Sequence, residues 1–267
     1  PLEDGACRRW DLTDPARDFL LRDAPMSMTN LVRFSPGTTT VWPELSATLR
    51  RGRPTRSVED DEGLFYSRLA TATAPMGMAV AGVAAAALPD PALVLDLGAG
   101  AAPWAVAMLQ AWPQARGIAV ELPSIAPITR AAAAAHGLAD RLEVIAGSYL
   151  DAVLPIGEAA VVTLGQVLGL QSPDLSKALL LRARGALRPG GFVVIGDYLR
   201  SQTRPTGRDP IATVTLSMAL TWIANTAQAE VLTMSTLRSW LTEVGLVIWA
   251  TMEPLPGQWV VIATEPA

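Results

Sequence analysis

A glycine-rich turn after an apolar run is the first place where this sequence could do chemistry. The stretch LVLDLGAGAAPW holds Asp96, Gly98 and Gly100 at alternate positions. Glycines there let the backbone turn tightly and approach a ligand closely. A pyrophosphate would want free helix N–H groups, but Pro103 lacks one and no Lys or Arg accompanies the loop. Ala102 also replaces the third glycine of a dinucleotide fingerprint, so the loop favours another kind of ligand.

The ends of later apolar runs carry further candidate ligand-binding residues. Glu121 follows Gly98 by 23 positions (121 − 98), and a carboxylate there can accept hydrogen bonds from both hydroxyls of a ribose. It could equally be a glutamate that caps the next helix. The triplet Gly147-Ser148-Tyr149 ends the third run, where the sheet order would place an adenine. Asp197 closes a run that follows the turn RPGG.

These residues need a framework, and the chain from residue 92 on alternates apolar runs with helical patterns. We expect strands at 92–97, 115–122, 141–147, 158–164, 192–197, 246–252 and 258–265. We expect helices at 103–112, 125–135, 174–187, 211–224 and 236–244. The short turn EPLPG joins the last two strands, which predicts an antiparallel pair at the sheet edge. The pattern predicts an α/β fold whose mostly parallel sheet has helices on both faces and binds ligands at the strands' carboxyl ends.

The first 60 residues are rich in Pro, Arg, Thr and Asp and predict only short helices. One helix is expected at 14–21, capped by Asp14 with Pro15 at its first position, and another at 42–50. Residues 64–88 predict an Ala-rich helix, or a helix pair interrupted at Pro75. Because the chain begins without a methionine and with a poor domain start, we expect part of an N-terminal domain to be missing.

Composition excludes several functional classes. Half of the 267 residues are hydrophobic, the mean hydropathy is +0.30 and the net charge is −4, which disfavours disorder and nucleic-acid binding. The apolar run 76–88 is too short to cross a bilayer and polar residues break the run 211–224, so we expect buried helices and no membrane partner. Cys7 is the single cysteine, which excludes an internal disulfide and fits a cytoplasmic protein. No Cys/His set for a metal exists.

Together these motifs resemble the class I S-adenosylmethionine-dependent methyltransferases. The resemblance is narrower to small-molecule O-methyltransferases of the caffeate, acetylserotonin and bacterial polyketide type. It rests on DLGAG, VELPSI, RLEVIAGSY, ALRPGGFVVIGD and LRSWLTEVGL. ARDFLLRDAP and WPELSATLRRGRP resemble the end of that family's winged-helix dimerisation domain. The resemblance implies a winged-helix remnant and linker over 1–62, a cofactor-binding domain over 63–267 with a Rossmann-like seven-stranded sheet, and a homodimer.

The resemblance implies S-adenosylmethionine as the cofactor and a role for each matching residue. Gly98 and Gly100 would line its methionine part, and Glu121 would bind the ribose in place of the family's usual Asp. Leu122 would touch the adenine and Tyr149 would pack on it, while Ser148 replaces the usual Asp. The full implied set is Asp96, Gly98, Gly100, Glu121, Leu122, Gly147, Ser148, Tyr149, Gly165 and Gln166.

The family's catalytic histidine is missing. Its segment HVLHDW reads QVLGLQ here, so Gly169 stands where the base should be, with Leu170 and Gln171 after it. The single histidine, His136, ends an alanine helix just before Gly137, where a cation complements the helix dipole. No catalytic residue can therefore be named.

Without that base, we expect an acceptor that needs little help. General-base catalysis is worth about 10²–10⁴-fold, whereas a methyl sulfonium is already activated, so an acidic phenol or enol, or transfer to carbon or nitrogen, would suffice. The candidate polar groups, none placed as a base, are Asp197, Tyr149, Tyr198 and Glu230. The resemblance implies that Gly169 and the helix carrying Met218 and Trp222 line the acceptor pocket. Those two side chains could equally be ordinary core.

Three functions remain open. The first is an S-adenosylmethionine-dependent methyltransferase of a hydroxylated aromatic or polyketide-like metabolite. The second is a non-methylating tailoring enzyme on the same fold, such as a hydroxylase, decarboxylase or pericyclase, and the third is a pseudo-enzyme subunit. A nicotinamide oxidoreductase is disfavoured by the loop and by the antiparallel tail.

Overall fold

The computed structural model describes residues 11–24, 26–55, 57, 64–89, 91–201 and 210–266. Its centre is a sheet in the order β3-β2-β1-β4-β5-β8-β7, with β6 paired to β5. The strands are β1 (Leu93–Leu97), β2 (Arg116–Glu121), β3 (Leu142–Ala146), β4 (Ala159–Gly165), β5 (Leu187–Arg200), β6 (Leu232–Thr233), β7 (Val247–Leu255) and β8 (Gln258–Thr264). The first five run parallel, and β8 is antiparallel to both β5 and β7. The expected antiparallel edge is therefore confirmed.

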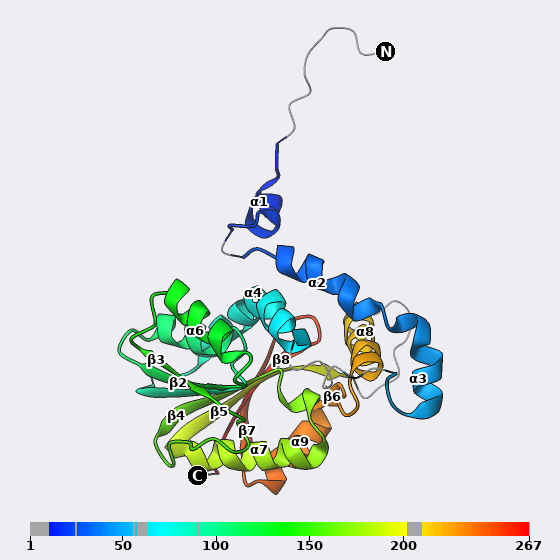
Figure 1. Ribbon diagram of the computed structural model, residues 1–267. Coiled ribbons are helices and arrows are strands. Elements are labelled where there is room, and N and C mark those ends of the chain that lie inside the picture. The colour runs from blue at the N-terminus through cyan, green and yellow to red at the C-terminus, as the bar shows by residue number, and fades with distance from the viewer. Residues whose placement is uncertain are drawn as a thin grey trace.

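Helices cover both faces of the sheet (Figure 1). They are α1 (Asp14–Leu20), α2 (Thr29–Thr39), η1 (Trp42–Glu44), α3 (Leu45–Arg51), α4 (Leu64–Ala87), α5 (Pro103–Ala111), α6 (Ala126–Ala135), η3 (Leu168–Leu170), α7 (Pro173–Ala186), α8 (Pro210–Asn225) and α9 (Met234–Glu243). Figure 1 shows α4 and α6 over one face, and α7 and α9 under the other. The mixed α/β fold with a mostly parallel, doubly covered sheet is confirmed.

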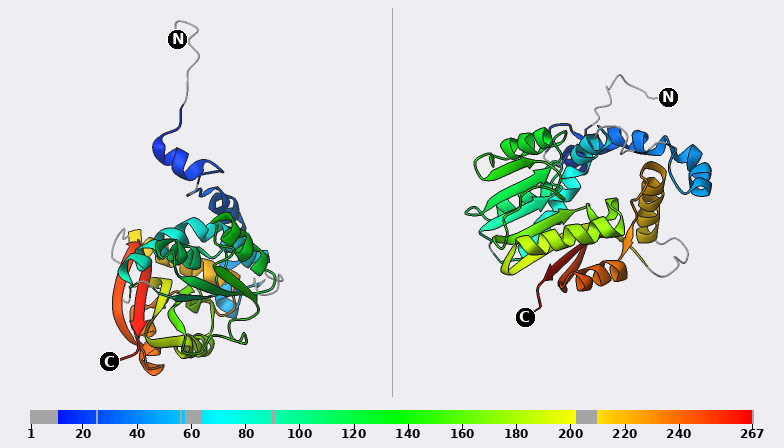
Figure 2. Two further views of the ribbon diagram at one scale, coloured as in Figure 1. Left: turned by 90° about the vertical axis from the view of Figure 1, so that its left-hand side faces the viewer. Right: turned by 60° about the horizontal axis from the view of Figure 1, so that its bottom comes forward.

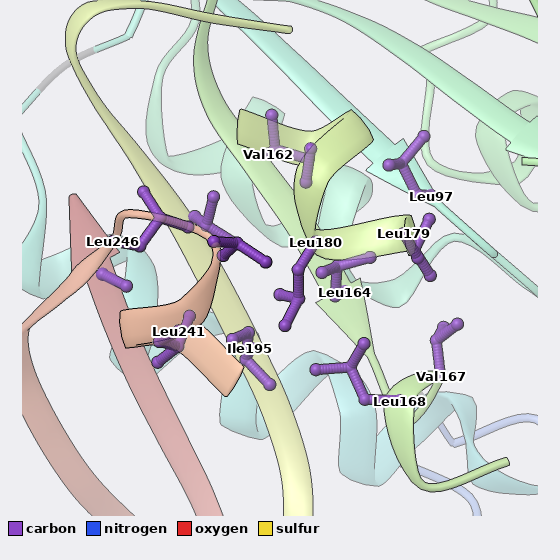
Figure 3. Packing of buried hydrophobic residues seen from close by; sticks show 14 of the residues in the cluster. Leu97, Val162, Leu164, Val167, Leu168, Leu179, Leu180, Ile195, Leu241 and Leu246 are labelled. Atoms are coloured by element: carbon purple, nitrogen blue, oxygen red, sulfur yellow. The ribbon is translucent and has the colours of Figure 1, made fainter. Parts of the chain in front are cut away.

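Each face of the sheet has its own hydrophobic core. On one face, Leu179 and Leu180 of α7 and Leu241 of α9 pack against Leu164 of β4 and Ile195 of β5 (Figure 3). On the other face, small side chains of α4 and α5, together with Trp104, pack against the opposite side of β4 and β5. Strands buried on both faces read as continuous apolar runs, which is why the runs located them.

Some elements differ from the sequence-based expectations. The sheet has eight strands rather than seven because the two-residue β6 joins it, and α2 forms although its sequence contains Pro36 and Gly37. Thr13, not Asp14, caps α1: its Oγ1 accepts from the Ala16 N–H at 3.4 Å. The expected helix 42–50 divides into η1 and α3.

Helix α4 is a single helix across Pro75 and not a helix pair. With 24 residues it is long and apolar enough, by length and composition alone, to cross a membrane, whereas the uninterrupted apolar run in the sequence, 76–88, covers only its second half. In the structure its small side chains, among them Val80, Ala81 and Ala84, are buried against α5. The same helix contacts α2.

The N-terminal helices lie along one end of the molecule. Helices α2 and α3 arch over α8 and contact it, as the tilted view in Figure 2 shows. Helix α1 has no buried residue and projects away from the sheet. The division into a winged-helix remnant over 1–62 and a cofactor-binding domain over 63–267 stays a prediction.

Candidate functional site

A cavity of about 520 Å³ lies at the carboxyl ends of the parallel strands. The loops after β1, β2, β3 and β4 form its floor, α4 forms one wall, and the first residue of β8 closes it on the far side. Of the residues expected to bind the cofactor, the lining includes Gly98, Gly100, Glu121, Leu122, Tyr149, Gly165 and Gln166. The sheet thus brings together residues from four separate loops.

The loop after β1 requires its two glycines. Gly98 has φ +76°, and a Cβ there would lie 2.8 Å from the Val167 side chain. Gly100 has φ +57°, and a Cβ would lie 3.2 Å from Ala70 of α4. Left-handed backbone is costly for other residues. The described non-glycine residues with positive φ are Ala102, which is buried as the N-cap of α5, and Gln166, which lines the cavity.

Glu121 ties the end of β2 to the glycine loop. Its carboxylate accepts hydrogen bonds from the Gly100 N–H at 2.6 Å and the Leu122 N–H at 2.7 Å. Burial raises the pKa of this carboxyl, and the two backbone N–H bonds oppose that rise. The side chain lines the cavity, so it presents a rigidly held carboxylate to a ligand.

Asp96 does not line the cavity. Its carboxylate is buried behind the loop, where Oδ1 accepts from the Thr163 hydroxyl at 2.7 Å and Oδ2 from the Ala105 N–H at 3.1 Å. The second bond satisfies a free N–H in the first turn of α5. Burial raises the pKa of Asp96 to about 6. The side chain fixes the loop and the helix rather than facing a ligand.

The segment after β3 contributes one side chain to the cavity. Tyr149 lines it and accepts a hydrogen bond on its hydroxyl from Gln171 Nε2 at 2.6 Å. Burial, followed by the nearby Glu121, raises the pKa of this phenol to about 12. Gly147 and Ser148 lie outside the lining: Ser148 Oγ accepts from the Leu150 N–H at 3.1 Å and caps the turn.

Backbone fills the position of the missing histidine. The Gly169 N–H donates to Asp197 Oδ2 at 3.1 Å, and the Gly169 carbonyl accepts from the Glu230 N–H at 2.8 Å. A Cβ on Gly169 would lie 2.9 Å from the Glu230 carbonyl oxygen. Asp197 also accepts from the Tyr198 N–H at 2.8 Å, and burial raises its pKa to about 6. It is thus a buried carboxylate that holds the Gly169 segment. Asp197 lies inside β5, which continues to Arg200, and not at the end of the strand as the sequence predicted.

None of the candidate bases is in the cavity except the phenol of Tyr149. Gly169, Asp197, Tyr198 and Glu230 are absent from its lining. His136 lies on the surface, where its Nδ1 is 3.3 Å from Gln110 Nε2.

Among the described lining residues the polar side chains are Ser57, Tyr66, Thr73, Glu121, Tyr149, Gln166, Gln171, Gln228 and Gln258. This part of the chain contributes one carboxylate to the lining and no Lys, Arg or His. Such a cavity suits a cationic or neutral ligand and lacks the partners that a pyrophosphate requires. No group of three metal-ligating side chains occurs among the described residues.

Met218 and Trp222 form part of the core behind the cavity. Trp222 is buried against Ala229 and Val231, and Met218 packs on this cluster together with Leu170. Leu170 does line the cavity, so the two side chains stand one layer away from it. Their role in acceptor binding stays a prediction.

Two further side chains of the cavity, those of Trp104 and Gln258, could not be recognised as site residues from the sequence. Trp104 was visible at the end of the glycine stretch, and Gln258 at the start of the last strand, but neither had a recognisable partner in the sequence. Both line the cavity. The residues of α4 carried no signal beyond their small size.

Residues 57–237 match the family model of the O-methyltransferase domain. The chain belongs to this family. This O-methyltransferase domain is 33% identical over 112 residues to demethylspheroidene O-methyltransferase of Cereibacter sphaeroides, covering 42% of this chain and 29% of that protein. It is 27% identical over 224 residues to acetylserotonin O-methyltransferase of Mus musculus, covering 77% and 57%. The chain therefore spans well under two thirds of these relatives.

Solved structures show the same fold as this O-methyltransferase domain. Human N-acetylserotonin methyltransferase in complex with S-adenosylmethionine superposes with a TM-score of 0.78 at 19% identity, covering 96% of this chain and 75% of that one. A mitomycin 7-O-methyltransferase gives a TM-score of 0.77 at 23% identity, covering 92% and 74%. At such identity the likeness concerns the fold.

Proposed function

We propose that this O-methyltransferase domain binds S-adenosylmethionine in the cavity and transfers its methyl group to a hydroxyl of a small aromatic or enolic metabolite. The observation that carries the proposal is the cavity itself, with a glycine loop, one buried carboxylate and no cation among its described lining residues. The relatives' names point the same way, since they are O-methyltransferases of small molecules.

The chain's own residues fit that cofactor. Glu121 offers carboxylate oxygens to ribose hydroxyls. Gly98 and Gly100 line the cavity with bare backbone, which an amino-acid arm can approach closely. Tyr149 and Leu122 provide apolar surface next to Glu121 against which the adenine ring could pack. S-adenosylmethionine would supply a methyl group that its sulfonium already activates.

The acceptor must then lose its proton without a histidine. The described lining residues of the cavity include four glutamines and two tyrosines, and the pKa of Tyr149 is raised rather than lowered. Amide side chains orient and exclude water but accept no proton at neutral pH. We infer that the acceptor's own hydroxyl is acidic, so that it reacts as a phenolate or enolate whose charge the bound sulfonium would offset, and that proximity and orientation supply the rate enhancement.

The test compares two phenols of different acidity, 4-nitrophenol and 4-methylphenol, by the release of S-adenosylhomocysteine. We expect kcat/KM for each phenol to rise with pH up to that phenol's own pKa, because only the phenolate reacts. A rate that follows one shared pKa for both phenols would show that a protein base operates and would contradict the proposal.

A second candidate is a non-methylating tailoring reaction on the same fold. The filled base position, with Gly169 clamped between Asp197 and Glu230, favours it. Formation of S-adenosylhomocysteine in step with product distinguishes methyl transfer from that alternative.

A further inference from the structure

Two buried polar atoms in the cavity have no partner. Among the described residues, the buried side-chain nitrogen and oxygen atoms without a hydrogen bond are Ser57 Oγ and Gln258 Oε1. Both residues line the same cavity. Leaving a buried polar group unpaired costs about 1–3 kcal/mol, so such groups are rare and call for an explanation. Their joint position at one cavity suggests that a ligand supplies the missing partner.

Gln258 is the stronger of the two because the sheet holds it rigidly. It is the first residue of β8, is 2% exposed, and pairs with Tyr198 of β5. Since side chains alternate along a strand, Gln258 faces the same side as Val260 and Ile262. Those two belong to the core beneath α4 and α5. The carboxamide therefore projects from a fixed strand and not from an adaptable loop.

The indole ring of Trp104, from α5, packs on the sheet close to the start of β8, where Gln258 lies. Trp104 lies against Gly165 of β4 and Gly196 of β5, where added Cβ atoms would meet its ring at 2.1 Å and 2.0 Å. Gly196 pairs with Val260, which is one same-face step from Gln258. Both Trp104 and Gln258 line the cavity. An aromatic ring beside an unpaired amide suits a flat ring that carries an oxygen.

Distance along the sheet separates Gln258 from the cofactor's proposed ribose site. Four steps between neighbouring strands lead from β2, which ends at Glu121, to β8, or roughly 19 Å at the usual strand spacing. The cofactor's arm from ribose ring to carboxylate has six bonds and reaches on the order of 8 Å. Gln258 thus lies four strands away from the proposed ribose site, toward the end of the cavity where a second molecule would meet the cofactor.

We propose that Gln258 binds the methyl acceptor, by hydrogen-bonding an oxygen substituent of a planar aromatic ring that packs by Trp104. This inference rests on the proposed function. The unpaired atom of the carboxamide is its carbonyl oxygen, which accepts a hydrogen bond, so it pairs with a protonated hydroxyl on the ring that lies beside the hydroxyl to be methylated. It recognises the acceptor without a charge.

The experiment replaces Gln258 with methionine, which keeps the side chain's length and removes its polar atoms. Gln110→Met, on an exposed glutamine of α5 outside the cavity lining, is the matched control. The Tm is measured without ligand, and the Kd is measured for S-adenosylmethionine. The probe is 2,3-dihydroxynaphthalene, whose Kd is measured with S-adenosylhomocysteine bound and whose KM and kcat are measured with S-adenosylmethionine bound.

We expect Gln258→Met to keep or raise the Tm, because it removes an unpaired buried amide, and to leave the cofactor's Kd within about twofold. The probe's Kd and KM should rise about tenfold, the usual effect of one lost hydrogen bond, with kcat less affected. Gln110→Met should change none of these. Gln258→Leu serves in the same way if the methionine variant does not fold.

The outcomes separate the inference from the proposed function. A fall in Tm for both Gln258→Met and Gln258→Leu would show that Gln258 has a structural partner. A tenfold loss of cofactor affinity would assign Gln258 to the cofactor, and either result overturns the inference. So would failure of the probe to bind wild-type protein that binds the cofactor. Failure of wild-type protein to bind S-adenosylmethionine would overturn the proposed function instead, and the Tm comparison would still decide whether the amide is structurally paired.

Discussion

At the scale of single residues, Glu121 carries most of the proposed cofactor recognition. Glu121→Gln keeps its shape and removes its charge, so the Kd for S-adenosylmethionine should rise about 10-fold or more, as expected for a lost charge-assisted hydrogen bond. Calorimetric titration measures this effect. Asp140→Asn, an exposed carboxylate, is the control and should leave the Kd unchanged.

The pH dependence of cofactor binding follows from the same carboxyl. Burial raises the pKa of Glu121 above 4.5, so the carboxylate that binds the ribose is progressively protonated as pH falls through that raised pKa. Affinity should be highest above it and weaken below it. Glu121→Gln should show little of this dependence, and an equally steep loss in the variant would assign the effect to another group.

A substitution at Gly169 tests whether placing a histidine there is enough to restore a general base. Gly169→His places a Cβ 2.9 Å from the Glu230 carbonyl oxygen. Because that atom belongs to the backbone, relieving the clash requires the backbone to shift. We expect the variant to unfold about 1–3 kcal/mol more easily, as overpacked sites do, and to gain no activity. A variant that keeps the wild-type Tm and methylates a weakly acidic phenol tenfold faster would contradict this account.

Residue types and spacing located the cavity but not every side chain's direction. Gly98, Gly100 and Glu121 follow from the loop's geometry and from the strand ends, and they do line the cavity. Asp96 and Ser148 occupy motif positions yet bond to nearby backbone. A sequence gives the distance from a strand end but not which way a side chain turns, and it gave no sign that Gln258 would be unpaired.

At the scale of elements, the packing of α5 on the sheet depends on two strand positions that are glycine and so have no side chain. Trp104 fits against β4 and β5 because Gly165 and Gly196 have no Cβ. Gly196→Ala should therefore lower the free energy of unfolding by about 1–3 kcal/mol, measured in urea. Gly185→Ala, in α7 with nothing within 4 Å of the added Cβ, should instead raise it by roughly 0.5–1 kcal/mol. Equal effects would contradict this explanation.

Elements with strong patterns were predictable and weak ones were not. Apolar runs located strands β1 to β4, although β3 is only partly buried. The helical pattern at 174–187 located α7, whose cap in the structure is Ser172. Helix α2 contains Pro36 and Gly37, so local preference argued against it, and β6 is too short to show a period. Helix α4 continues through Pro75 because its Ala-rich face packs on α5. Tertiary packing decided these cases.

At the scale of the whole molecule, exposed apolar side chains gather on α8 and on the N-terminal helices. Val214, Leu216, Leu220 and Ile223 of α8 are exposed, as are Phe19 and Leu20 of α1. Exposed apolar surface marks interaction sites, and we propose that it supports a homodimer. Light scattering should give twice the mass of one chain, and Leu216→Lys with Leu220→Lys should give the single mass. An unchanged mass in the double variant would assign the dimer to another surface.

The central claim is that a methyl group moves from S-adenosylmethionine to an acidic hydroxyl in this cavity without a protein base. The most direct measurement uses S-adenosylmethionine with an isotopically labelled methyl group, incubated with the protein and acidic phenols and followed by mass spectrometry. We predict label on the acceptor oxygen, with one S-adenosylhomocysteine formed per product, and slower formation of both in Glu121→Gln when the cofactor concentration is below the variant's raised Kd. An acceptor changed without label, or a cofactor bound but left intact, would contradict the claim and favour the non-methylating reaction.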